Sequence, residues 1–113
     1  MVSKAIARFA RLSPRKARVV VELVRGRAAG EALQLLEFTT KAGAPVLKKL
    51  IESAVANART TSPGVDVDSL FVETAFVDKA ANKQMRRWRP RAMGRATQIQ
   101  KGISHITIHL GTR

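Results

Sequence analysis

The fold of this chain is decided by residues 67–110, which read VDSLFVETAFVDKAANKQMRRWRPRAMGRATQIQKGISHITIHL. Near both ends of this stretch, the side chains alternate in character with the period of two that is typical of a β-strand. In residues 67–77, one predicted face carries Leu70, Val72, Thr74 and Phe76, and the other carries Phe71, Glu73, Ala75 and Val77. In residues 97–110, Ile106, Ile108 and Leu110 lie opposite His105, Thr107 and His109. We therefore expect a strand at each end.

Between these strands stand residues 79–96, a connection of 18 residues that is long for a hairpin loop in a compact domain. If both arms of the connection are extended, about nine residues each way, at roughly 3.4 Å per residue, reach about 30 Å beyond the body. The chain has 113 residues and no linker, which is typical of one domain. We therefore predict a single domain over 1–113, with a globular body at 1–78 and 97–113 and an extended hairpin loop at 79–96.

The charges of the chain are unbalanced and unevenly placed. It has 21 Lys and Arg against 8 Asp and Glu, a formal net charge of +13. From residue 79 onward there are nine basic residues and no acidic one, namely Lys79, Lys83, Arg86, Arg87, Arg89, Arg91, Arg95, Lys101 and Arg113. Residues 1–21 add six more without an acid, namely Lys4, Arg8, Arg11, Arg15, Lys16 and Arg18. Such blocks repel themselves in water and are typical of surfaces that bind phosphates, so we expect RNA or DNA as the partner.

Composition argues against several other classes of protein. The chain has no cysteine, which rules out disulfide frameworks and thiolate metal sites. Its apolar runs are far shorter than the roughly 20 residues that a membrane-spanning helix requires, and no signal-peptide pattern opens the sequence. We therefore expect a soluble, cytoplasmic protein without a membrane partner.

In the sequence before residue 67, local patterns predict one strand and three helices. Residues 2–12 alternate, with Ala5, Ala7 and Phe9 on one face and Lys4, Ile6, Arg8 and Ala10 on the other. Ser13 is a suitable N-cap and Pro14 suits the first helical position, so a helix should run to about Val24 and stop at Gly26. Further helices are expected over 29–37 and 41–59, the latter with the clearest apolar stripe: Val46, Leu47, Leu50, Ile51, Ala54, Val55 and Ala58.

Basic side chains crowd the start of the first predicted helix. Arg15, Lys16 and Arg18 oppose the helix dipole there, so we interpret them as placed for an external anion. Asn57, a poor helix former between two alanines of the third helix, is either solvent-exposed or in contact with RNA, and we favour the contact.

Arginine dominates residues 86–95, and its planar guanidinium suits bidentate phosphate contacts and stacking on bases. The alternative for this segment is a solvated, disordered charge run. Pro90 and Gly94, as turn formers between two strands, favour binding instead. Trp88 either stacks on a nucleobase or packs against the neighbouring arm of the hairpin, and the sequence leaves both interpretations open.

Candidate catalytic and metal-binding residues are few. His105 and His109 share a strand face, but residues 79–113 hold no carboxylate or cysteine that would complete the three or four ligands of a zinc site. Asp66, Asp68 and Asp78 fall at strand ends without a nucleophile or base beside them. We therefore expect no metal, no cofactor and no catalysis. A sequence-nonspecific DNA-binding protein and a hydrolase built on these residues remain the alternative functions.

Several motifs together resemble a known family. They are Ser13-Pro14-Arg15-Lys16-Ala17-Arg18 with Arg25-Gly26, then Glu52-Ser53-Ala54-Val55-Ala56-Asn57-Ala58, then Arg89-Pro90-Arg91-Ala92-Met93-Gly94-Arg95-Ala96 and Ser104-His105-Ile106-Thr107. In this order and over essentially the whole chain, they resemble the bacterial form of the large-subunit ribosomal protein family number twenty-two. One departure is that residues 79–85 stand where the family usually has a Gly-Pro pair and a short run.

The resemblance implies an α+β fold, with three helices packed on a small antiparallel three-stranded sheet and a long protruding β-hairpin. It implies a structural protein that binds large-subunit ribosomal RNA, supports assembly, and lies on the ribosome beside neighbouring large-subunit ribosomal proteins. The ribosome is expected to be cytoplasmic, and an organellar ribosome is the alternative that the sequence leaves open. It also implies that the hairpin lines the peptide exit tunnel, where it meets the nascent peptide, and that the protein is not a homo-oligomer.

Two sets of candidate residues follow from the charges and the resemblance together. The predicted contacts with ribosomal RNA are Lys4, Arg8, Arg11, Ser13, Arg15, Lys16, Arg18, Asn57, Lys79, Lys83, Arg86, Arg87, Trp88, Arg89, Arg91, Arg95, Lys101, Ser104 and His105. The residues that the resemblance places in the tunnel wall are Arg86, Arg87, Pro90, Arg91, Gly94 and Arg95.

Overall fold

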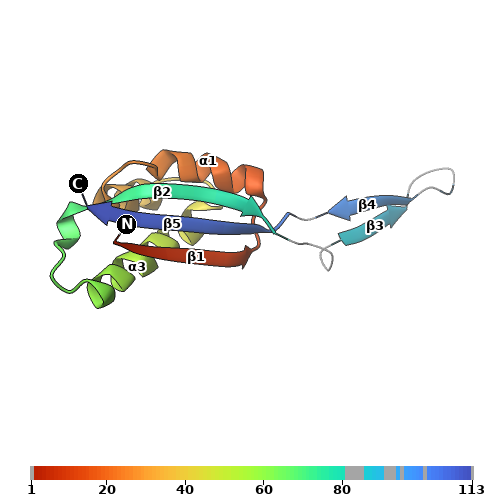
Figure 1. The fold of residues 1–113 in the computed structure, drawn as a ribbon. Helices are drawn as coiled ribbons and strands as arrows, with labels where there is room; N and C mark the ends of the chain where they lie inside the picture. The colour runs from red at the N-terminus through yellow and green to blue at the C-terminus, as the bar shows by residue number, and fades with distance from the viewer. Residues whose placement is uncertain (1, 81–85, 91–93, 95, 101, 113) are drawn as a thin grey trace.

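A computed structural model describes residues 2–80, 86–90, 94, 96–100 and 102–112 (Figure 1). In chain order, the elements are β1 (Ser3–Ala10), α1 (Pro14–Val24), α2 (Ala29–Glu37), α3 (Ala44–Thr61), the 3-10 helix η1 (Val67–Ser69), β2 (Leu70–Lys79), β3 (Arg86–Pro90), β4 (Ala96–Gln100) and β5 (Ser104–Thr112). This content confirms the predicted α+β class.

The body is built on a three-stranded antiparallel sheet with β5 in the centre. Its order is β1-β5-β2, and the register places Ala5 beside Ile108 and Ile108 beside Ala75. These three side chains are buried on the face that the helices cover, whereas Lys4 and Ile6 of β1 are exposed on the other face. One side of the sheet therefore forms the core, and the other side is left open by the described helices.

The first helix forms as its local sequence predicts. The Ser13 hydroxyl oxygen accepts the Lys16 backbone N–H at 3.3 Å, and Pro14 occupies the first turn. After α1, Gly26 adopts a φ of 81°, a left-handed conformation that glycine takes at little cost. Between these ends, α1 buries the predicted stripe: Ala17, Val20, Val21 and Val24.

The long helix α3 begins at Ala44, slightly later than expected, with Pro45 in its first turn, and continues to Thr61. It buries most of the predicted stripe, namely Leu47, Leu50, Ile51, Ala54 and Ala58. The other two residues of the stripe lie at its edges: Val55 is partly buried, and Val46 is 36% exposed. The period-of-3.6 pattern thus identified the core face of this helix correctly.

Bulges make two predicted strand faces wrong. In β2 the register shifts between Val72 and Thr74, so Ala75 rather than Thr74 follows Val72 into the core. Phe76, predicted on the same face as Leu70, is consequently 39% exposed on the open side. A bulge adds one residue to a strand and thereby reverses the faces of all residues beyond it. Residues 67–69, predicted as strand, form the 3-10 helix η1 instead.

The second bulge is in β1, where the register shifts between Ala7 and Ala10. Phe9 lies in this interval with a φ of 54° and is 61% exposed. The prediction that Phe9 shares the core face of Ala5 and Ala7 is therefore wrong.

The hairpin projects from one end of the body (Figure 1). β3 and β4 pair antiparallel, from Arg86 beside Gln100 to Pro90 beside Ala96. The single strand predicted over 97–110 is thus divided into β4 and β5, with Gly102 between them. A backbone hydrogen bond of 2.9 Å from Ala80 N to the Ile103 carbonyl closes the base. With the hairpin included, the molecule measures 65 × 26 × 16 Å.

Candidate nucleic-acid interface

Three body segments meet where the hairpin leaves the sheet. In the sheet register, Ser104 lies beside Ala10 of β1 and beside Lys79 of β2. The start of α1 packs here too, because a Cβ atom added to Gly102 would lie only 3.1 Å from Ser13 Cα. The end of β1, the start of α1 and the end of β2 are therefore neighbours at the base of the hairpin.

This convergence gathers the cations that the sequence places far apart. We call this part of the surface the basic end, and define it by the exposed residues Arg8, Arg11, Arg15, Lys16, Arg18 and Lys79. Asp78, also exposed, lies beside His105 in the register and brings one acid to the same region. The basic end therefore combines six predicted RNA-contacting residues from β1, the turn after it, α1 and β2, and the chain leads from it into the hairpin.

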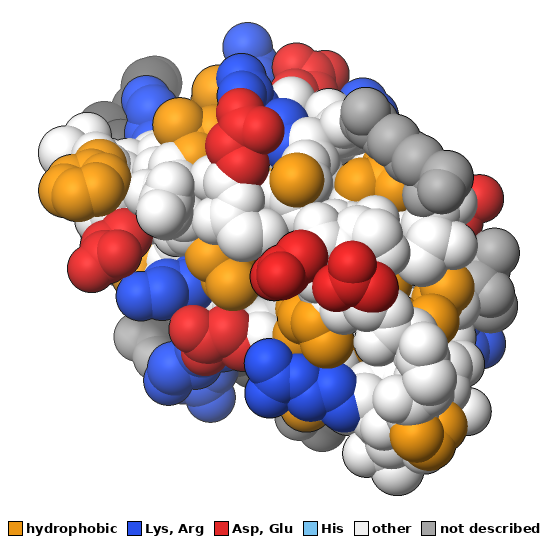
Figure 2. Space-filling view, turned by 90° about the vertical axis from the view of Figure 1, so that its left-hand side faces the viewer, with side chains coloured by type: hydrophobic (Ala, Val, Ile, Leu, Met, Phe, Trp, Pro, Cys, Tyr) orange, Lys and Arg blue, Asp and Glu red, His pale blue; other side chains and the backbone are white. Residues whose placement is uncertain are grey.

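The opposite end of the body differs in charge. Asp66 caps η1 by accepting the Asp68 N–H at 3.0 Å, and both acids stand just ahead of β2. Figure 2 views this end of the molecule and shows acidic side chains spread across it among hydrophobic and basic ones. The charge is therefore polarised along the long axis, with the hairpin at the positive side.

Arg18 of α1 and Arg25, the C-cap residue of the same helix, both donate hydrogen bonds to the edge strand β2. Arg18 Nη2 donates to the Val77 carbonyl at 3.1 Å, and Arg25 donates to the Ala75 carbonyl through Nε at 3.3 Å and Nη2 at 2.8 Å. Arg18 is nevertheless an exposed residue as a whole. Arg25 was not among the predicted site residues, and its role in these contacts is to hold α1 against the sheet.

One predicted RNA contact, Ser104, is buried inside the body. Ser104 is 0% exposed, and its hydroxyl donates to the Leu12 carbonyl. Its side chain therefore links β5 to the turn before α1 and does not reach the surface. The contact of Ser104 with RNA stays a prediction, and the role that the structure shows for its hydroxyl is this intramolecular hydrogen bond.

Two further predicted contacts also have intramolecular partners. Asn57 Nδ2 donates to the Lys4 carbonyl at 3.0 Å, which joins α3 to β1, although Asn57 remains exposed. The Ser13 hydroxyl oxygen serves as the N-cap of α1. Both side chains stabilise the body, and their contact with RNA stays a prediction.

The two histidines lie on the open face of the sheet and contact aromatic rings. His105 Nδ1 accepts the Phe9 backbone N–H at 3.1 Å, and the two rings meet edge to face with centroids 4.8 Å apart. His109 contacts Phe76 in the same manner at 6.1 Å. Among the described residues, no three His, Cys, Asp or Glu side chains are grouped so that they could hold a metal ion.

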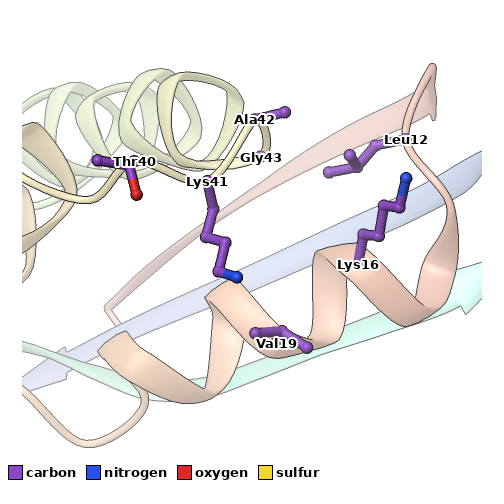
Figure 3. A pocket seen from close by; sticks show the side chains of 7 residues that line it. All are labelled: Leu12, Lys16, Val19, Thr40, Lys41, Ala42 and Gly43. Carbon is purple, nitrogen blue, oxygen red and sulfur yellow. The ribbon is translucent and has the colours of Figure 1, made fainter.

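A cleft beside the basic end adds a cation that the sequence did not predict. It lies between α1 and the loop before α3 and is lined by Leu12, Lys16, Val19, Thr40, Lys41, Ala42 and Gly43 (Figure 3). Lys16 and Lys41 reach into the region from opposite sides, over apolar side chains. No pattern in the sequence relates Lys41 to Lys16, because their proximity depends on how the loop packs against α1.

The remaining predicted site residues belong to the hairpin. Lys83, Arg91, Arg95 and Lys101 lie outside the described residues. The structure gives the backbone of β3, which contains Arg86, Arg87, Trp88, Arg89 and Pro90. Gly94 is exposed with a φ of 71°, which suits its predicted role as a turn former.

In the part of the chain that the structure describes, no helix has the length and apolar character to span a bilayer.

Comparison with known proteins is consistent with this arrangement. The sequence pattern of the family described as ribosomal protein L22p/L17e matches residues 5–111. A protein of Sorangium cellulosum (strain So ce56) named large ribosomal subunit protein uL22 is 64% identical over 113 residues, which cover 100% of this chain and 99% of that protein. Its namesake from Syntrophobacter fumaroxidans (strain DSM 10017 / MPOB) is 51% identical over 113 residues, with 100% of both chains covered. This chain therefore belongs to the ribosomal protein L22p/L17e family.

Proposed function

We propose that this chain is a structural protein of the large ribosomal subunit in the cytoplasm, where it binds large-subunit ribosomal RNA and supports assembly. Membership in the L22p/L17e family and the names of its two relatives support the assignment to that subunit. The protein acts by holding RNA in place and performs no chemistry of its own.

The observation that carries the RNA-binding part is the basic end. Side chains from β1, α1 and β2 that are separated by up to 71 positions, from Arg8 to Lys79, meet at the base of the hairpin. Like charges gathered in this way destabilise the free protein, so they are best explained by an anionic partner that neutralises them. The partner contacts the basic end and the hairpin together, because Lys79 of the basic end stands at the end of β2 from which the chain enters the hairpin.

The hairpin has a separate role in this proposal. Its paired strands β3 and β4 extend from the body, and a narrow cationic projection can enter folded RNA where a globular surface cannot. It lines the peptide exit tunnel, with Arg86, Arg87, Pro90, Arg91, Gly94 and Arg95 as the residues of the tunnel wall. There it meets the nascent peptide, while the body contacts RNA and neighbouring ribosomal proteins.

The salt dependence of RNA binding tests the first part. Each phosphate contact lowers log K by roughly 0.7–0.9 per unit of log salt, so the parent protein should show a steep slope with a large-subunit ribosomal RNA transcript. Replacing Arg15 and Lys16 by Gln should reduce that slope by about 1–2. Arg18 is left in place because its guanidinium also holds the Val77 carbonyl.

The matched control removes two charges elsewhere, through Lys49→Gln with Arg59→Gln on α3. It should leave the slope close to that of the parent. A parent slope near zero would contradict the proposed function, and equal slopes for the two double variants would contradict the placement of the RNA at the basic end.

A further inference from the structure

Phe9 is an exposed aromatic side chain held in an unusual backbone conformation. Its φ of 54° lies in the left-handed region, where a bulky residue is an outlier that the surrounding structure must maintain. Two contacts with His105 maintain it: the Phe9 N–H donates to Nδ1 at 3.1 Å, and the rings meet edge to face at 4.8 Å. Phe9 is thus anchored at its backbone and at part of its ring, while the residue as a whole is 61% exposed.

The bulge determines where this ring points. In a regular strand, Phe9 would lie on the face of Ala5 and Ala7 and would join the core. The register shift between Ala7 and Ala10 removes it from that face and presents it to solvent. A strained segment that exposes a large apolar ring contributes nothing to the core, so its use is best sought outside the protein.

The neighbours of Phe9 indicate what that use is. Arg8 and Arg11 are both exposed, and the hairpin base lies beside the same end of the strand, since Ala10 pairs with Ser104. An aromatic ring between cations is the arrangement with which proteins bind unpaired nucleotides, because bases stack on the ring and phosphates contact the charges. An apolar protein partner would instead leave both guanidinium groups unpaired at the interface.

We propose that Phe9 stacks on an unpaired nucleobase of the RNA, while Arg8 and Arg11 contact phosphates on either side of it. This inference rests on the proposed function, because it presumes that the basic end binds ribosomal RNA. It further requires that the RNA has an unpaired base where it contacts Phe9.

The test compares Phe9→Leu with the parent on a large-subunit ribosomal RNA transcript. Leucine keeps an apolar side chain beside His105 but offers no planar face, so affinity should fall about 5- to 140-fold. The salt slope should remain that of the parent, because no charge is removed. Phe9→Tyr should bind within about threefold of the parent, since a phenol ring stacks as well.

Phe38→Leu is the matched control. Phe38 is 82% exposed at the C-terminal end of α2, next to Glu37 and outside the basic end, so this variant should bind RNA like the parent. A regular RNA duplex is the second probe: its bases are already stacked, so Phe9→Leu should bind it as the parent does. Melting temperatures of all variants, measured alongside, show that each is folded at the assay temperature.

Three outcomes would overturn the inference. Parent-like binding of Phe9→Leu to the transcript, with the steep salt dependence intact, would refute stacking and leave the proposed function standing. Equal losses on the transcript and the duplex would mean that Phe9 acts through the fold. A loss shared by Phe9→Tyr would show that the effect is not one of ring stacking. A parent protein without salt-dependent binding would instead refute the proposed function itself.

Discussion

At the scale of single residues, the base of the hairpin is held by two small residues, Gly102 and Ser104. Gly102 allows the chain to pass against Ser13 and Pro14, where a Cβ atom would lie 3.1 Å from Pro14 Cδ and from Ser13 Cα. Two residues later, the buried Ser104 hydroxyl donates to the Leu12 carbonyl. Together they attach the start of β5 to the start of α1, so they set the position of the hairpin relative to the cations of α1.

Ser104→Ala should therefore destabilise the body without changing how it recognises RNA. The Leu12 carbonyl would lose its partner, which typically costs about 1–3 kcal/mol of unfolding free energy. Denaturant unfolding would measure this loss, and Ser53→Ala, at an exposed position of α3, should change stability by less than about 0.5 kcal/mol. An unchanged midpoint for Ser104→Ala would show that the bond contributes little, whereas weaker binding of RNA by the folded variant, at an unchanged salt slope, would support Ser104 as an RNA contact.

Residue roles could be predicted where they depend on near neighbours in sequence. The N-cap at Ser13 was predicted because its partner, Lys16, is three positions away. The roles of Ser104, Asn57 and Phe9 could not be predicted, since their partners lie 92, 53 and 96 positions away. Such contacts depend on tertiary packing, which a one-dimensional pattern does not specify.

At the scale of elements, the hairpin and the body depend on different interactions. β3 and β4 pair with each other in a sheet of their own, and the core residues described in the body all lie outside residues 81–101. At the junction, Ala80 and Ile103 are buried and joined by a backbone hydrogen bond. The body should consequently close and fold without the hairpin.

Replacing residues 81–101 by an Asn-Gly turn should leave the melting temperature of the free protein almost unchanged. The Ala80–Ile103 bond would remain, and Asn-Gly followed by Gly102 gives a three-residue loop, a common length between antiparallel strands. Leu47→Ala, which empties a fully buried position, is the positive control and should cost about 2–5 kcal/mol. A drop for the shortened variant as large as that of Leu47→Ala would mean that the hairpin stabilises the body.

Helices were predicted more accurately than strands, for a physical reason. The buried stripe of a helix repeats within one element, so the local sequences of α1 and α3 are sufficient to identify their buried faces. The faces of β1 and β2 depend on bulges that form against β5, and nothing in the local sequence marks the shifts near Phe9 and Thr74. For the same reason, the break at Gly102 that separates β4 from β5 was not predicted.

At the scale of the whole molecule, the antiparallel sheet brings basic residues from distant parts of the sequence to one end of the body. The sequence shows that both ends of the chain are basic and that all eight acids lie between Glu22 and Asp78. It does not show that the end of β1, the start of α1 and the end of β2 meet at one place, because this follows from the strand order β1-β5-β2. The phosphate-binding character was therefore predictable, whereas the basic end as a surface was not, and neither was the addition of Lys41 beside it.

Two separable RNA-binding parts on one molecule lead to a prediction about the ribosome. The basic end belongs to the body, so a variant with residues 81–101 replaced by an Asn-Gly turn should still enter large subunits when expressed as a tagged copy beside the resident protein. Mass spectrometry of purified subunits would measure its occupancy, which should fall below that of a tagged parent because the hairpin contacts are lost. Adding Arg15→Gln and Lys16→Gln should reduce occupancy much further, since both parts would then be weakened.

Subunits that carry the shortened variant should also respond differently to antibiotics that bind in the exit tunnel, because a section of the proposed tunnel wall is missing. The tagged parent controls for the tag, and Lys49→Gln with Arg59→Gln controls for loss of charge outside the basic end. If the shortened variant folded normally yet never entered subunits, the hairpin rather than the basic end would be the main anchor. If it entered at full occupancy and left the antibiotic response unchanged, the hairpin would be neither an anchor nor part of the wall, and the long cationic projection would need another partner.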